Sequence, residues 1–167
     1  MIARMHKRLL PILLATTLWL LTGCEGTNWR SSVPSYPIHL EFNTNVGMYV
    51  SFVPENIMGY IIADAKGIHY NGITYPLTVQ DAYGYAGTVV YIDGMHPYGA
   101  YDLCCPHCLL RNKPCTVDGM FATCPECHEE YDIYSGNGTP RKGISREPLK
   151  EYNARYIDHK VIVTAKQ

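Results

Sequence analysis

The sequence predicts a mostly β fold, and three observations support this prediction. Fourteen tyrosines and fourteen glycines occur in 167 residues, together with many valines, isoleucines and threonines, a composition typical of strands joined by tight turns. No segment after Cys24 carries a long apolar run at helical spacing. Several short segments instead alternate apolar and polar residues, which is the period of a half-buried strand.

The expected elements follow in chain order. Residues 36–42 alternate and predict the first strand, with Pro37 tolerated near its start. Residues 48–53 and 60–63 are short apolar runs, and 68–79 predict a hairpin around Asn71-Gly72. Residues 87–93 predict a strand that ends in a turn at Asp93-Gly94. Segments 100–103, 121–123 and 130–133 flank the cysteines, and 152–163 predict a closing hairpin that turns at Asp158-His159.

The first 24 residues predict export and lipidation. Arg4, Lys7 and Arg8 precede a mostly apolar run over residues 9–21, which is the order of a secretory signal and is too short for a membrane-spanning helix. Leu21-Thr22-Gly23-Cys24 matches the bacterial lipobox, which implies that residues 1–23 are a signal peptide and that Cys24 is lipidated. Because Arg8 follows Lys7 rather than a second arginine, the twin-arginine signal of folded export is absent.

The mature chain is expected to form one domain outside the cytoplasm. Removal of residues 1–23 from 167 leaves 144, enough for a single core. We interpret residues 24–35 as a tether and 36–167 as the domain, with a metal-loop subdomain at about 100–135. A net charge of -1 argues against a nucleic-acid partner. Glu25 stands where an inner-membrane retention signal has aspartate, which favours lipid anchoring in the outer membrane of a bacterial cell envelope.

Six of the seven cysteines lie between residues 104 and 127, which indicates a local site rather than disulfides spread through a small fold. Cys105 and Cys108 form one C-x-x-C pair, and Cys124 and Cys127 form a second pair after fifteen intervening residues, a spacing typical of metal sites. A second ligand set is also present, in which His107 replaces Cys108. Both sets stay open on spacing alone.

From about Gly87 to Val163 the chain resembles the Rieske iron–sulfur domain. Cys105-Pro106-His107 matches the first C-x-H loop of that family, and Cys124 begins the second loop. Tyr131-Asp132, Ser135-Gly136 and Glu147-Pro148-Leu149 with Tyr152 match the surrounding frame. The resemblance implies a Rieske-like antiparallel β-sandwich with a small cysteine-loop subdomain. Cys127, however, stands where the family has its second histidine, so the two-histidine iron of a Rieske cluster is not provided.

The metal-loop chemistry therefore leaves three alternatives. Four thiolates suit a closed structural zinc site, whereas four thiolates, or three with His107, suit a [2Fe–2S] cluster for electron transfer. Disulfides without metal are the third alternative, because an oxidising compartment joins unprotected cysteines. Export in an unfolded state favours zinc slightly, since zinc binds outside the cytoplasm and an iron–sulfur cluster does not readily assemble there.

The other residues near the cysteines receive more ordinary interpretations. Given the resemblance, Cys104 and Cys115 either form a disulfide, as occurs in some Rieske proteins, or are plain buried residues. We expect His128 to be an exposed neighbour of the site. A solvated charged face is expected from Glu129, Glu130, Arg141, Lys142 and Arg146. No nucleophile elbow, phosphate-binding glycine loop or HExxH motif is present, so no enzyme is predicted, and any redox role would be electron transfer with an unknown partner.

Overall fold

The computed structural model describes residues 31–56, 58–92, 98–135 and 137–166. Within these ranges the chain is almost entirely β, which confirms the predicted fold class. The strands are β1 (Ile38–Asn43), β2 (Tyr60–Asp64), β3 (Gly67–Tyr70), β4 (Ile73–Tyr75), β5 (Ala82–Tyr83), β6 (Thr88–Tyr91), β7 (Gly99–Asp102), β8 (Thr116–Asp118), β9 (Phe121–Thr123), β10 (Glu130–Asp132), β11 (Thr139–Lys142), β12 (Glu151–Ile157) and β13 (Lys160–Thr164). A single turn of 3-10 helix, η1, spans Gly47–Tyr49.

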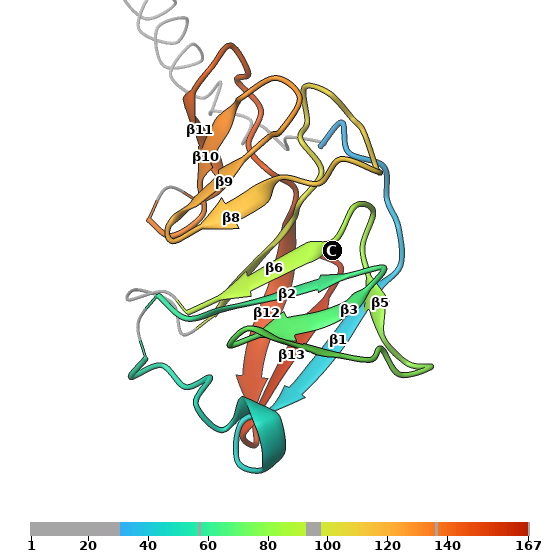
Figure 1. Ribbon diagram of the computed structural model, residues 1–167, viewed down its shortest axis with the longest axis vertical. Helices are drawn as coiled ribbons and strands as arrows, with labels where there is room; N and C mark the ends of the chain where they lie inside the picture. Colours follow the sequence, from blue (N-terminus) through green and yellow to red (C-terminus); the bar gives the residue numbers. More distant parts are fainter. Residues whose placement is uncertain (1–30, 57, 93–97, 136, 167) are drawn as a thin grey trace, which may run out of the picture. The chain divides into compact units, whose positions relative to one another are not determined.

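Nine strands form one antiparallel sheet in the order β4-β3-β2-β6-β7-β12-β13-β1-β5 (Figure 1). The two predicted hairpins are both present in it. β3 and β4 turn at Asn71 and Gly72, with φ of 50° and 76°, and β12 and β13 turn at Asp158 and His159, with φ of 49° and 61°. The last strand pairs with the first, since Phe42 lies opposite Val161. The closing hairpin therefore joins the two ends of the described chain.

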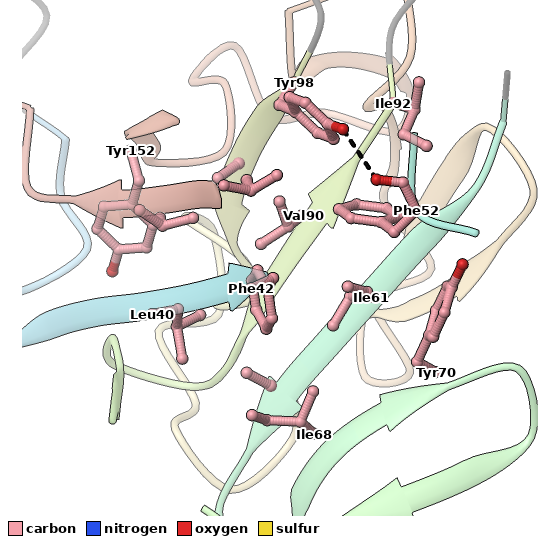
Figure 2. Close-up of a cluster of buried hydrophobic side chains, with 14 of the residues drawn as sticks. Leu40, Phe42, Phe52, Ile61, Ile68, Tyr70, Val90, Ile92, Tyr98 and Tyr152 are labelled. Atoms are coloured by element: carbon pink, nitrogen blue, oxygen red, sulfur yellow. Dashed lines mark hydrogen bonds between the residues drawn. The ribbon is translucent and has the colours of Figure 1, made fainter. Parts of the chain in front are cut away.

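The main core is enclosed by the nine-stranded sheet (Figure 2). Its side chains come from alternate positions of the strands, as the pattern Ile38, Leu40, Phe42 in β1 illustrates. Tyr98 contributes its ring and donates its hydroxyl to the carbonyl of Phe52 at 2.8 Å. This donation satisfies the one polar group that the ring carries into the core. No cysteine belongs to this cluster.

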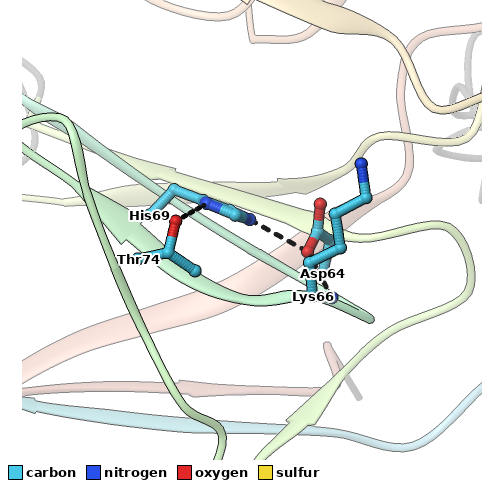
Figure 3. Close-up of polar contacts among 4 residues, drawn as sticks. All are labelled: Asp64, Lys66, His69 and Thr74. Carbon is cyan, nitrogen blue, oxygen red and sulfur yellow. Dashed lines mark hydrogen bonds and ion pairs between the residues drawn. The ribbon is translucent and has the colours of Figure 1, made fainter.

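A network of polar side chains connects β2, β3 and β4 at one edge of the large sheet (Figure 3). His69 in β3 lies between Thr74 Oγ1, at 2.9 Å from Nδ1, and Asp64 Oδ1, at 3.0 Å from Nε2. The backbone N–H of Lys66 donates to the same Asp64 oxygen at 2.7 Å. Burial raises the pKa of Asp64, but the His69 and Lys66 hydrogen bonds outweigh it and leave that pKa below its ordinary value. The network therefore ties β2, β3 and β4 together through side chains as well as the backbone ladder.

Four further strands form a smaller sheet in the order β11-β10-β9-β8 (Figure 1). β9 and β10 enclose the second cysteine pair, with Thr123 opposite Glu130. The first cysteine pair follows β7 of the large sheet. This arrangement confirms the expected small cysteine-loop subdomain. β8 and β11 were not anticipated, because neither carries an apolar alternation; as edge strands they are paired on one side only, and the edge position of β11 tolerates Pro140.

The end of the expected tether packs against the domain. Val33 is only 2% exposed, and the Lys150 ammonium donates to the carbonyls of Val33 at 3.2 Å and Pro34 at 3.0 Å. Among the described residues, contacts with the domain are therefore already present at Ser31. The lipobox, Cys24 and the expected Asp93-Gly94 turn lie outside the described residues. Within the described part of the chain, no helix has the length and apolarity needed to cross a membrane.

Candidate metal centre

The two cysteine loops follow the same backbone path. In the first loop the N–H of Leu109 donates to the carbonyl of Cys105 at 2.9 Å, and in the second the N–H of His128 donates to the carbonyl of Cys124 at 3.0 Å. Leu109 and His128 both have left-handed backbones, with φ of 55° and 60°. Each C-P-x-C sequence therefore forms one tight turn that ends in a left-handed residue, with the proline fixing the second position.

Hydrogen bonds at the base of each loop close these turns. The N–H of Cys124 donates to the carbonyl of Glu129 at 2.8 Å, across the β9–β10 hairpin. The N–H of Cys115 donates to the carbonyl of Leu103 at 2.8 Å, which closes the longer segment that contains the first loop. Both loops are thus fixed by backbone contacts that do not involve their sulfur atoms.

The loops bring four sulfur atoms together. The Sγ atoms of Cys105, Cys108, Cys124 and Cys127 all lie within 4.8 Å of one another. The Cys105–Cys127 distance is 3.7 Å and the Cys108–Cys124 distance is 3.9 Å, and both pairs join one loop to the other. A tetrahedral ion with metal–sulfur bonds of ~2.3 Å requires sulfurs about 3.8 Å apart. The four thiols therefore have the spacing of the ligand shell of a single ion.

His107 lies outside this set of four sulfurs. Its side chain is exposed, and its Nδ1 is 3.8 Å from the Cys108 sulfur. One of its ring nitrogens also lies within 4.8 Å of the Cys127 sulfur and a Glu129 carboxyl oxygen. Of the two residues that the spacing left open, the structure places Cys108 with the other three thiols and His107 at the rim. His128 is exposed as well.

The inner half of the centre is embedded in apolar side chains. Cys105 and Cys124 are buried in a second core cluster with Leu103, Tyr131 and Ile133, whereas Cys108 and Cys127 are half-buried. The Tyr131 hydroxyl lies 3.3 Å from the Cys105 sulfur. Burial, followed by the hydrogen bond to Cys105, raises the pKa of Tyr131. The hydroxyl therefore keeps its proton and can donate it toward a thiolate.

The thiols differ in how readily they ionise. Burial raises the pKa of Cys124, but the backbone N–H groups of Cys127 and Glu126 outweigh it and leave that pKa below its usual range. Burial raises the pKa of Cys108 and of Cys127. Without a metal, Cys108 and Cys127 therefore keep their protons. A coordinated metal ion would deprotonate them, and its positive charge would stabilise the closely spaced thiolates.

Glu129 is a buried carboxyl directly behind the second loop, and its assignment to a solvated face was wrong. It is 1% exposed, and its Oε1 accepts from the backbone N–H groups of Ile144 at 2.6 Å and Ser145 at 2.9 Å. Oε2 is buried without a hydrogen-bond partner among the described residues. A Cβ at Gly143 would lie 2.3 Å from the carboxyl carbon. Glycine at 143 thus makes room for the carboxyl, a relation between distant residues that no local pattern reveals.

Asp102 fixes the root of the first loop and was not singled out from the sequence. Its Oδ1 accepts from the N–H of Cys104 at 2.8 Å, and its Oδ2 accepts from the N–H of Tyr85 and the hydroxyl of Tyr152, both at 2.6 Å. The carboxyl is fully buried. The Asp102 carboxyl oxygens therefore link the end of β7 to two other parts of the chain, which are β12 and the segment that precedes β6. This link lies where the chain enters the first cysteine loop.

Cys104 and Cys115 are free thiols in the structure. Cys104 packs with Val33 and Ala86, whereas Cys115 belongs to the cluster around Tyr131. Burial raises the pKa of Cys104 to about 12 and raises that of Cys115 as well. Both behave as buried apolar side chains, and the disulfide between them stays a prediction without structural support.

Comparison with known proteins gives only weak likenesses. No family model and no curated protein matches the chain. A chain from the complex of reduced oxygenase and oxidized ferredoxin in carbazole 1,9a-dioxygenase is similar at 21% identity and a TM-score of 0.39, over 52% of this chain and 78% of that chain. The Sphingomonas yanoikuyae B1 ferredoxin is similar at 19% identity and a TM-score of 0.36, over 62% of this chain and 88% of that chain. Likenesses at this level assign neither a family nor an activity.

Proposed function

We propose that this chain is a lipid-anchored, extracytoplasmic metal-binding protein of Rieske-like build, in which Cys105, Cys108, Cys124 and Cys127 bind one tetrahedral ion, zinc in preference. The observation that carries the proposal is the mutual distance of the four sulfurs, all within 4.8 Å. A closed shell of four thiolates is typical of structural zinc, which contributes directly to folding stability. The role of the ion is to hold the two loops together.

The same geometry argues against a [2Fe–2S] cluster. In such a cluster two ligands bind each of two irons, which are bridged by sulfides. The two ligand pairs must then lie further apart than ligands around one ion. Here all four sulfurs lie within 4.8 Å of one another, so no pair stands apart from the other. A cluster would need the pair Cys105 and Cys127 to move away from the pair Cys108 and Cys124.

Electron transfer is the second candidate function, and one contact favours it. The Tyr131 hydroxyl lies 3.3 Å from the Cys105 sulfur, and hydrogen bonds to ligand sulfurs are a means of tuning the potential of an iron centre. Iron would be accepted by the same tetrahedral thiolate shell as zinc. A metal-free, disulfide-braced surface binding protein is the remaining alternative.

Ligand substitution tests the proposed shell. We expect Cys108→Ala to lose the metal, measured by elemental analysis of the purified protein, and His107→Ala to retain it. Cys104→Ala is the matched control, because it removes a buried cysteine outside the shell and should leave metal content unchanged. Retention by Cys108→Ala with loss by His107→Ala would replace this assignment with the Rieske-type ligand set. Absence of metal and of free thiols in the wild type would support the disulfide alternative.

The lipid anchor is tested separately. Replacement of Cys24 by alanine should move the protein from the membrane pellet to the soluble fraction, because no lipid can then be attached. If the variant stays in the pellet and resists a salt wash, Cys24 is not the anchor.

A further inference from the structure

The exposed segment Arg141–Arg146, which comprises the last two residues of β11 and the loop that follows, combines one apolar side chain with three cations. Ile144 is 78% exposed. Arg141 and Lys142 precede it, Arg146 follows it, and all three are exposed. Lys142 and Arg146 form no ion pair with any residue in the described ranges, while Arg141 lies 4.0 Å from Glu130 and over the Phe121 ring. An apolar tip among cations is the pattern of a segment that meets an anionic lipid surface.

The described chain begins at the base of this loop. The Ser32 N–H donates to Glu147 Oε1 at 2.5 Å, and the Ser31 hydroxyl donates to the same oxygen at 3.2 Å. Glu147 follows Arg146 directly, and the Ser145 hydroxyl donates to the carbonyl of Glu147 at 3.3 Å. Ser31 is thus held beside Glu147, which is three positions after Ile144 in the sequence. Figure 1 shows the start of the described chain, in blue, at the same end of the domain as β11.

The length of the preceding segment limits how far this end can lie from a lipid on Cys24. Ser31 is seven positions after Cys24, and seven residues span at most about 24 Å when fully extended. The opposite end of the large sheet, with η1 and the β12–β13 turn, has no such connection. Of the two ends of the domain, the one that carries the cysteine loops is therefore held near the membrane.

We propose that the segment Arg141–Arg146 contacts the bilayer, with Ile144 in the interface and the cations at anionic headgroups. The proposal rests on the lipid anchor at Cys24 given under Proposed function. It has a consequence for the cysteine centre, because Ile144 and Ser145 donate their backbone N–H groups to Glu129, directly behind the second cysteine loop. The cysteine centre then lies at the end of the protein that faces the membrane. The segment that contacts the lipid also holds Glu129 in place behind the second cysteine loop.

Tryptophan quenching in the full lipidated chain tests the contact. In a Trp29→Phe background the mature chain has no tryptophan, so Ile144→Trp gives a single reporter. The protein is reconstituted into vesicles of phosphatidylglycerol and phosphatidylcholine with brominated acyl chains. We expect at least twofold quenching by the brominated lipid, a blue-shifted emission and protection from aqueous iodide. Charge reversal in the same chain, Lys142→Glu with Arg146→Glu, should remove most of the quenching.

The matched control is Val79→Trp, at a fully exposed apolar position between β4 and β5. It should be quenched by iodide and not by brominated lipid. If the vesicles float with the protein bound but Ile144→Trp responds as Val79→Trp does, the membrane contact of Arg141–Arg146 is overturned and the anchor stands. If the protein does not float with the vesicles, the anchor itself fails, and the membrane contact that rests on it is overturned as well.

Discussion

At the scale of single residues, two buried carboxyl groups organise the cysteine loops. Asp102 accepts hydrogen bonds at the entrance to the first loop, and Glu129 accepts them directly behind the second. Buried acceptors with several backbone donors fix a segment in one conformation, because each donor left unpaired would cost about 1–3 kcal/mol. The loops are therefore positioned by groups other than their sulfurs before any ion binds.

A substitution at Gly143 tests whether the close approach of this glycine to the Glu129 carboxyl contributes to stability. In Gly143→Ala, the new Cβ would lie 2.3 Å from the Glu129 carboxyl carbon, at a φ of +119°. Gly119→Ala is the reference for an open left-handed position, because its φ is +57° and nothing lies within 4 Å of the new Cβ. The reference should lose about 1–2 kcal/mol from backbone strain alone. Gly143→Ala should lose clearly more by urea unfolding, because a less accessible φ and overlap with the Glu129 carboxyl act together; equal losses would show that the close approach of Gly143 to Glu129 does not matter.

At the scale of elements, the two C-P-x-C turns are the repeated unit of the site. Each ends in a left-handed residue whose N–H bonds back to the first cysteine carbonyl. Left-handed backbone disfavours β-branched side chains and is accepted by glycine. The identity of the residue after each second cysteine should therefore affect metal binding through the turn and not through ligation.

His128 separates these two roles. We expect His128→Gly to retain the metal, because glycine keeps the left-handed turn, and His128→Val to weaken binding by roughly tenfold, the equivalent of the ~1–2 kcal/mol of strain at such a position. Competition with a chelator measures both affinities. Loss of metal from His128→Gly as well would mean that the imidazole is a ligand, contrary to the turn account.

The elements that could be predicted from the sequence are those with a local signal. Asn71-Gly72 identifies a hairpin because its turn needs left-handed residues, and the C-P-x-C spacing identifies the loops. β8 and β11 carry no such signal, since their pairing depends on neighbouring strands. The burial of Glu129 depends on Gly143, fourteen positions later. The choice of Cys108 over His107 for the sulfur set depends on the path of the loop, which spacing alone left open.

At the scale of the whole molecule, the described residues form two large buried clusters, besides the small one around Cys104. The cluster inside the nine-stranded sheet contains no cysteine, whereas Cys105, Cys115 and Cys124 are all in the second cluster. Metal removal should therefore act mainly on the smaller sheet. Glycine, proline and polar residues make up much of its short strands and loops, so little apolar burial is available there to replace the ion.

Hydrogen exchange after chelation tests this division. Amides of β8 to β11 should lose protection when the metal is removed, while those of β1, β12 and β13 should keep theirs, because their core is independent of the ion. The holo-protein under the same conditions is the reference. A uniform loss of protection across both sheets would mean that the ion supports the whole fold.

If the four thiols form the ligand shell of a single ion, the purified wild-type protein contains one metal per chain, and metal stoichiometry measures this. Elemental analysis combined with visible absorption and an assay for acid-labile sulfide distinguishes the candidates. Because all four sulfurs lie within 4.8 Å of one another, we expect one metal per chain, no labile sulfide, and a colourless protein if that metal is zinc. Two irons with two labile sulfides per chain and a brown colour would rule out the single-ion site.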